Sequence, residues 1–299
     1  MYHNPVMLQE CIDGLQIDPN GIYVDVTFGG GGHSKLILEQ LENGHLYAFD
    51  QDSDAKRNIP EDSRFTLIHE NFRHIKNFLR LHGVKKIDGL LADLGVSSHQ
   101  FDTAERGFST RFDGPIDGRM DQRGKITGSQ ILNTYGLQEL TNMFRLYGEL
   151  KNAYKLSHHI IKAREESPFD TIENLKDNLL PFAPKFKENK FFAQVFQALR
   201  IEVNQELDAF KEMLEQCEQI MNPNGRLVIL SYHSLEDRIA KNYIRTGNVQ
   251  GELHKDFYGK VQNSWKAITR KPLTAKEEEI ANNSRARSAR LRIAEKIDD

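Results

Sequence analysis

The feature that most constrains the fold of this sequence is a run of four glycines, Gly29–Gly32, between a predicted strand and a predicted helix. Residues 21–28 are rich in β-branched and aromatic side chains, which favour strands, whereas residues 33–41 repeat apolar residues at helical spacing. Glycine lets a backbone turn sharply and approach a ligand closely. Strand, glycine turn and helix together indicate an α/β sheet with a ligand at this turn.

The alternation of strand and helix continues along the first third of the chain. Short apolar strands are predicted at 45–50, 64–69 and 87–93, and later at 226–232, 266–271 and 289–294. Strands that are separated by helices form parallel sheets covered on both faces. We therefore predict an α/β protein of the Rossmann-like type.

The alternation stops for about a hundred residues after Leu94. The chain is then rich in glycine and charge up to Lys125, and apolar residues recur at helical spacing in 136–147, 153–163 and 172–180. We interpret residues 106–196 as an inserted helical domain for substrate recognition, and residues 1–105 and 197–299 as the domain that binds the cofactor. One long helix, from about residue 192 to 221, would lead back into the sheet.

Composition excludes several classes of protein. With 38% hydrophobic residues and 9 prolines in 299 residues, the chain can bury a sizeable core and is not a disordered protein. Its longest apolar stretches are of strand length, far below the roughly 20 residues that span a bilayer, and its first residues lack the features of a secretory signal. We expect a cytoplasmic protein without a membrane segment.

Two cysteines, Cys11 and Cys217, lie far apart and form no CxxC pair. This spacing argues against both a zinc knuckle and a disulfide framework. The aspartates Asp113, Asp117 and Asp121 lack the glycine and the glutamate of a calcium-binding loop, and we expect them to pair with Arg111 and Arg119. No metal site is predicted.

The net charge of −3 conceals an uneven distribution. The segment Arg106–Arg200 carries 15 Lys and Arg against 11 Asp and Glu, and Lys266–Lys296 carries 9 against 4. Such basic surface fits a polyanionic partner, because contacts to phosphates supply most sequence-independent affinity for nucleic acid. Solvated helix faces would give the same excess, so charge alone does not decide.

The cofactor is indicated by an acidic residue after the second predicted strand. Asp50 follows Gly31 by 19 residues, where a carboxylate can accept the hydroxyl protons of a ribose. The dinucleotide fingerprint requires a third glycine at its sixth position, which is Ser34 when counted from Gly29 and Lys35 when counted from Gly30. No P-loop lysine follows the turn either, so neither phosphate-binding motif is present. S-adenosylmethionine, which has a ribose but no phosphate, fits this pattern better. Phe72, just past the third strand, either lies against the adenine or packs in the core.

Longer motifs in the chain resemble those of the small-subunit ribosomal RNA methyltransferase H (MraW) family, over residues His3 to Glu295. The motifs are Asp93-Leu-Gly-Val-Ser-Ser98, Ala104-Glu-Arg-Gly-Phe-Ser109, Asp113-Gly-Pro115, Arg119-Met-Asp121, Ser231-Tyr-His-Ser-Leu-Glu-Asp-Arg238 and Ile268-Thr-Arg-Lys-Pro272. The resemblance implies a class I methyltransferase that methylates N4 of a decoding-region cytidine in 16S rRNA. Its partner would be 16S rRNA or the small ribosomal subunit. A homodimer is compatible with the sequence, which does not fix the oligomeric state.

By the same resemblance, seven residues would contact S-adenosylmethionine. They are Gly31, Gly32, His33, Asp50, Phe72, Asp93 and Gln100. Two positions depart from the family pattern: His99 replaces a proline before Gln100, and Tyr232 replaces a phenylalanine. The first leaves the loop of Gln100 less rigid and makes its contact the least secure of the seven, whereas we expect the second to be neutral.

Asp93 is the candidate catalytic residue, because it ends the fourth predicted strand, where an open α/β sheet binds its ligand. It either accepts a hydrogen from the target amine or serves only the cofactor, and the sequence does not separate these roles. His233 is a second candidate acceptor, although we favour the interpretation of a hydrogen-bonded histidine beside a helix cap. Two other functions stay open: an aminomethyltransferase of DNA, and an RNA-binding assembly factor without turnover.

Overall fold

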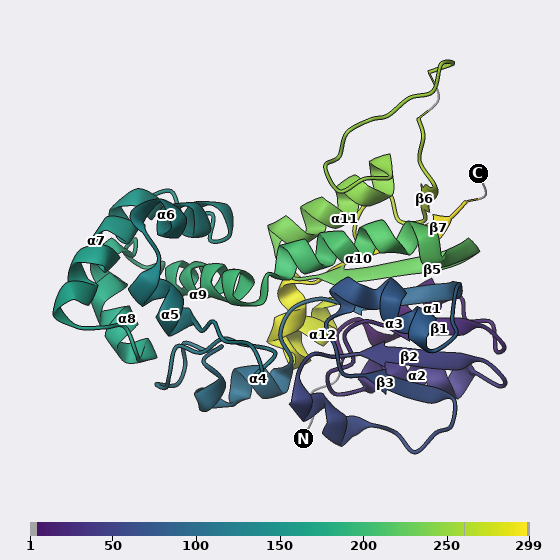
Figure 1. Cartoon of the computed structure of the whole chain (residues 1–299), viewed down its shortest axis with the longest axis horizontal. Helices are drawn as coiled ribbons and strands as arrows, with labels where there is room; N and C mark the ends of the chain where they lie inside the picture. Colours follow the sequence, from purple (N-terminus) through teal and green to yellow (C-terminus); the bar gives the residue numbers. More distant parts are fainter. Residues whose placement is uncertain (1–4, 260, 298–299) are drawn as a thin grey trace. The chain divides into compact units, whose positions relative to one another are not determined.

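The computed structural model describes residues 5–259 and 261–297. The chain divides into two compact units, one formed by Met1–Gly95 with Leu207–Asp299 and the other by Val96–Glu206. The first unit contains the sheet and the second is helical (Figure 1).

The sheet unit is built on seven strands in the order β3-β2-β1-β4-β5-β7-β6. Its strands are β1 (Ile22–Asp25), β2 (His45–Phe49), β3 (Phe65–Ile68), β4 (Ile87–Asp93), β5 (Met221–Ser231), β6 (Trp265–Ala267) and β7 (Arg290–Lys296). Strands β1 to β5 pair in parallel, whereas β7 is antiparallel to both of its neighbours. The order reverses between β1 and β4, and the carboxyl ends of strands at such a switch point are where open α/β sheets bind ligands.

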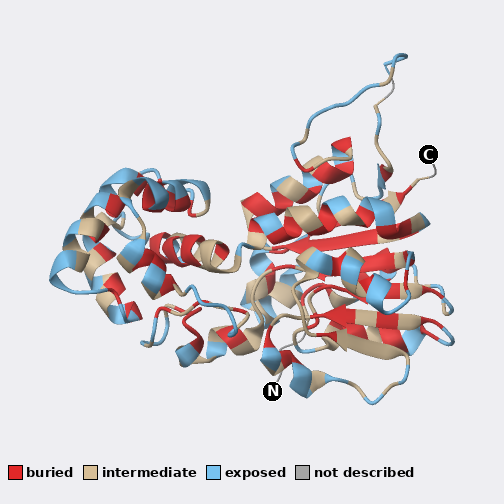
Figure 2. Cartoon of the chain, in the orientation of Figure 1, coloured by how far each residue is buried: buried red, intermediate tan, exposed pale blue. Residues whose placement is uncertain are grey.

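Helices cover both faces of the sheet because its central strands are apolar on both sides. Leu90 joins the core formed with α3 (Ile75–Leu81), α10 (Glu206–Ile220) and α11 (Ser234–Thr246). Its neighbour Leu91 joins the opposite core, with α1 (Leu8–Leu15), α2 (Gly32–Gln40) and the segment around the short α12 (Glu277–Asn282). Figure 2 shows the central strands as buried. The predicted α/β, Rossmann-like fold is confirmed.

The helical unit has its own hydrophobic core. It contains α4 (Ser98–Asp102), α5 (Gly128–Thr134), α6 (Leu137–Leu146), α7 (Ala153–Glu166), α8 (Ile172–Leu179) and α9 (Glu188–Asn204). The three helices predicted from apolar spacing correspond to α6, α7 and α8. No helix among the described residues of either unit is long and apolar enough to cross a bilayer.

The helical unit is larger than the predicted insert of residues 106–196, because it spans Val96–Glu206. The long helix predicted near 192–221 is in fact two helices, α9 and α10. Gln205 separates them with a left-handed backbone (φ 50°), which ends α9. The chain therefore returns to the sheet unit ten residues later than the apolar pattern indicates.

Candidate active site

The glycine turn joins β1 to α2, as the sequence predicts. Gly31 caps α2 with a left-handed backbone (φ 76°), and its N–H donates to the carbonyl of Phe28 at 2.7 Å. A Cβ on Gly31 would lie 3.0 Å from the Phe28 ring, and one on Gly32 would lie 2.1 Å from Pro5 Cγ. Both positions thus require glycine, the first for its conformation and the second for its space.

Asp50 directly follows β2 and is bonded to the glycine turn. Its Oδ2 accepts the Gly29 N–H at 2.7 Å, and its Oδ1 accepts the Asp52 N–H at 2.8 Å. Burial raises the pKa of the Asp50 carboxyl to about 6, although both hydrogen bonds favour the ionised form. The predicted pair of glycine turn and carboxylate is therefore a single local structure.

Asp93 is the last residue of β4, and side chains from three other segments contact it or its backbone. The Tyr232 hydroxyl donates to Asp93 Oδ1 at 2.7 Å, and the Asp93 N–H donates to Thr27 Oγ1 at 2.7 Å. His33 Nδ1 lies 3.7 Å from Asp93 Oδ2, and the other ring nitrogen of His33 is 3.3 Å from the carbonyl of Val6. Tyr232 thus binds one carboxylate oxygen, and His33 lies nearest the other.

The electrostatic surroundings of Asp93 are mixed. Burial is the main influence and raises the pKa of its carboxyl to about 6. The nearby His33 and the hydrogen bond from Tyr232 oppose this rise, whereas the carboxylates of Asp25 and Glu236 add to it. Asp93 therefore titrates close to neutral pH, which suits a group that exchanges hydrogen during catalysis.

Asp25 is a residue that the sequence analysis missed. It ends β1, is 1% exposed, and accepts hydrogen bonds from the Ser34 hydroxyl at 2.7 Å and from the Thr27 N–H at 3.0 Å. A charged residue between two valines, just before the glycine turn, was the signal available in the sequence. Its carboxylate fixes the turn by binding both of its flanks.

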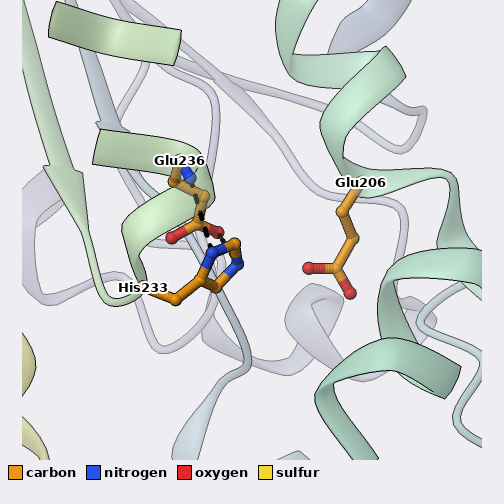
Figure 3. A group of neighbouring side chains, drawn as sticks. All are labelled: Glu206, His233 and Glu236. Atoms are coloured by element: carbon orange, nitrogen blue, oxygen red, sulfur yellow. Dashed lines mark hydrogen bonds and ion pairs between the residues drawn. The ribbon is translucent and has the colours of Figure 1, made fainter. Parts of the chain in front are cut away.

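His233 is the N-cap of α11, which begins at Ser234. Its Nδ1 accepts the Glu236 N–H at 3.4 Å, and its Nε2 lies 3.1 Å from Glu236 Oε1 (Figure 3). The other oxygen of Glu236 accepts the Tyr232 N–H at 3.0 Å. His233 therefore serves the helix start, and the structure favours the capping interpretation over a role as proton acceptor.

Phe72 and Gln100 have local roles in the structure. Phe72 begins a 3-10 helix just after β3 and is partly buried against the core on the α3 face. Gln100 belongs to the helical unit, where it forms a capping box at the start of α4: its Oε1 accepts the Ser97 N–H, and its own N–H donates to Ser97 Oγ. The side chain of Gln100 is buried.

Several basic residues form ion pairs with acidic side chains. Arg119 binds Asp117, as expected, whereas Asp121 pairs with Arg123 instead. In the basic tail, Arg292 is buried and binds Asp237 at 2.7 Å. Part of the basic character that suggested a nucleic-acid partner therefore stabilises the fold.

Comparisons with known proteins identify the family of the chain. The ribosomal RNA small subunit methyltransferase H proteins of Flavobacterium johnsoniae and Christiangramia forsetii are 56% and 55% identical to the chain, each over 99% of the chain and 98% of the relative. A crystal structure of an rRNA methylase from Streptococcus thermophilus is similar with a TM-score of 0.39 at 13% identity, covering 97% of this chain and 95% of that one. The model of the MraW methylase family matches residues 1–297, and the chain belongs to this family of methyltransferases.

Proposed function

We propose that this protein uses S-adenosylmethionine to methylate N4 of a cytidine in the decoding region of 16S rRNA. The observation that carries the proposal is the placement of three features on neighbouring strands of the sheet. The glycine turn follows β1, Asp50 follows β2, and Asp93 ends β4. All three lie at the carboxyl ends of parallel strands beside the switch point.

The residues present fit the cofactor. Asp50, which is bonded to the turn at Gly29, would accept the ribose hydroxyls, and the left-handed Gly31 would let the cofactor approach the turn closely. His33 and Asp93 would line the methionine end, and Phe72 would lie against the adenine. Gly32 completes the set within the sheet unit, and the contact of Gln100 stays a prediction from the family resemblance. The bound cofactor supplies a methyl group that is already activated by its sulfonium.

Asp93 has the chemistry of a hydrogen acceptor for the target amine. Tyr232 holds its Oδ1, and its Oδ2 would accept a hydrogen of the exocyclic amine as the new nitrogen–carbon bond forms. The raised pKa, about 6, makes this carboxylate a better acceptor than an exposed aspartate while leaving most of it ionised at neutral pH. Positioning of the amine by the pocket would contribute the rest, through effective molarity.

The substrate is proposed from the family. Its relatives are named for the RNA of the small ribosomal subunit, so we expect the protein to act in the cytoplasm on 16S rRNA or on the assembled subunit. A related enzyme of DNA and an assembly factor without turnover are the competing functions. The intact Asp50 and Asp93 argue against the assembly factor, and a methyl-transfer assay on RNA and DNA distinguishes all three functions.

A methyl-transfer assay with the purified protein tests the proposal. Radiolabelled S-adenosylmethionine is incubated with 16S rRNA, small subunits or DNA, and the nucleosides are then separated. We expect label only in N4-methylcytidine from rRNA. Label in DNA would support the first competitor, and no label on any substrate would support the second.

A further inference from the structure

A short turn before α9 presents an aromatic side chain to solvent. Phe186 is 96% exposed, between the exposed Lys185 and Lys187. It belongs to the helical unit, whose core collects the other phenylalanines of this region, such as Phe191 and Phe192. Unlike these neighbours, the Phe186 ring is free to contact a ligand, and the residues around it decide which kind.

The backbone of this turn is ordered by hydrogen bonds. The Lys187 N–H donates to the carbonyl of Pro184 at 3.0 Å, and the Phe186 N–H donates to Glu188 Oε1 at 3.0 Å. Phe186 itself has a left-handed backbone (φ 64°), a conformation that is unfavourable for bulky side chains and that glycine adopts easily. Such conformations persist where the surroundings fix them, and they are enriched at functional sites.

The charge around the Phe186 ring is positive. Lys185 and Lys187 flank it directly, and Lys190 is exposed one turn further along α9. In the part of the chain that the structure describes, no acidic side chain forms an ion pair with these three lysines. Glu188 is the acid nearest to them in the sequence, and one of its carboxylate oxygens accepts the hydrogen bond from the Phe186 N–H. The N-terminus of the 17-residue α9 adds partial positive charge.

We propose that this turn, Lys185–Phe186–Lys187 with Lys190, binds a single-stranded segment of the RNA substrate. Phe186 stacks on a base, and the lysines contact the flanking phosphates. Proteins that bind single strands combine these two elements, an exposed aromatic ring and surrounding cations. The inference rests on the proposed function and deepens it, because it assigns to the helical unit a surface that contacts the RNA substrate.

RNA fits this surface better than a protein or a membrane does. A protein interface would have a buried apolar centre with few charges, whereas here one ring stands among three lysines. A membrane anchor of this kind would need a wider apolar face to enter the lipid. The membrane remains an outcome of the test.

The test measures binding of the full-length protein to a single-stranded RNA from the decoding region, by fluorescence anisotropy at several salt concentrations. Phe186→Ala and Phe186→Leu should each weaken binding about tenfold to hundredfold, because leucine keeps the bulk but not the π face. The triple variant K185Q/K187Q/K190Q should make the dependence of log K on log salt less steep by about 2. Affinity for S-adenosylmethionine should stay at the parental value in all three.

Matched controls separate this surface from general charge and exposure. The triple K56Q/K85Q/K241Q removes the same charge from exposed positions of the sheet unit, and Phe257→Ala removes another ring, 97% exposed. Both controls should bind RNA like the parent. Phe186→Trp should keep the parental affinity, and its fluorescence should be quenched by RNA, which a purely structural role does not predict.

Three results would overturn the inference. The first is parental RNA affinity and salt slope in the Phe186 and triple-lysine variants. The second is an equal loss in the control triple. The third is unchanged RNA binding with lost binding to anionic phospholipid vesicles, which would identify a membrane surface. Failure of the proposed function itself would be visible in the parent, which would then transfer no methyl group to rRNA.

Discussion

Removing the Tyr232 hydroxyl should shift the pH dependence of methyl transfer. In Tyr232→Phe the ring stays and only the 2.7 Å hydrogen bond to Asp93 Oδ1 is lost. That bond favours the ionised carboxylate, so its loss raises the pKa of Asp93 further above the present value of about 6. Asp93 must be ionised to accept a hydrogen, and the variant should therefore lose activity at low pH and recover it at high pH.

The size of the shift follows from the strength of the bond. A hydrogen bond to a charged group contributes about 1.5 to 3 kcal/mol, and one pKa unit corresponds to about 1.4 kcal/mol. The Asp93 side chain is 23% exposed, so water replaces part of the lost bond and we expect a shift of about one unit. Ionised Asp93 would then fall about fivefold at pH 6 and about twofold at pH 7.

Single-turnover rates at saturating cofactor, measured from pH 5 to 9, test this prediction. The acidic limb of the Tyr232→Phe profile should move up by about one unit, while the rate at pH 9 stays near the parental rate. Tyr135→Phe is the matched control, because it removes a similar tyrosine–carboxylate bond, 2.8 Å long, to Glu202 in the helical unit. Superimposable profiles for parent and Tyr232→Phe would refute the role of Asp93 as an ionised acceptor.

Three further predictions concern substitutions of Asp50, Asp93 and Arg119. Asp50→Ala should weaken S-adenosylmethionine binding more than tenfold in calorimetry, and an affinity within threefold of the parent would contradict the ribose assignment. Asp93→Asn should slow single-turnover transfer about 10² to 10⁴-fold. It should also unfold in more urea than the parent at pH 7 because the ionised form of Asp93 is disfavoured by folding, and this advantage should shrink as the pH falls from about 6 towards 4. Arg119→Gln should lower the thermal midpoint of the protein, since Arg119 binds Asp117 and the carbonyl of Gly124, and an unchanged midpoint would contradict this structural role.

The sheet could be predicted because each strand and the glycine turn are recognisable from short stretches of consecutive residues. Strands such as β4 are short apolar runs, and the glycine turn is contiguous with the strand and helix that it joins. The length of the insert could not be predicted, because the break at Gln205 depends on a left-handed conformation that the apolar pattern does not reveal.

The contacts around Asp93 could not be predicted either, since they join residues far apart in the sequence. Tyr232 is 139 residues from Asp93, and its hydroxyl, which we expected to be a neutral difference from the family, binds the candidate catalytic carboxylate. Asp25 escaped notice because a polar residue within a short apolar strand has no partner visible in the sequence. In both cases the folded sheet edge brings the groups together.

The most direct test of the central claim is mass spectrometry of 16S rRNA from cells with and without the gene. Our account predicts that one decoding-region cytidine loses the mass of a single N4-methyl group when the gene is deleted. Wild-type protein should restore that methyl group, and the Asp93→Asn variant should not. An unchanged mass for every decoding-region fragment after deletion would contradict the account.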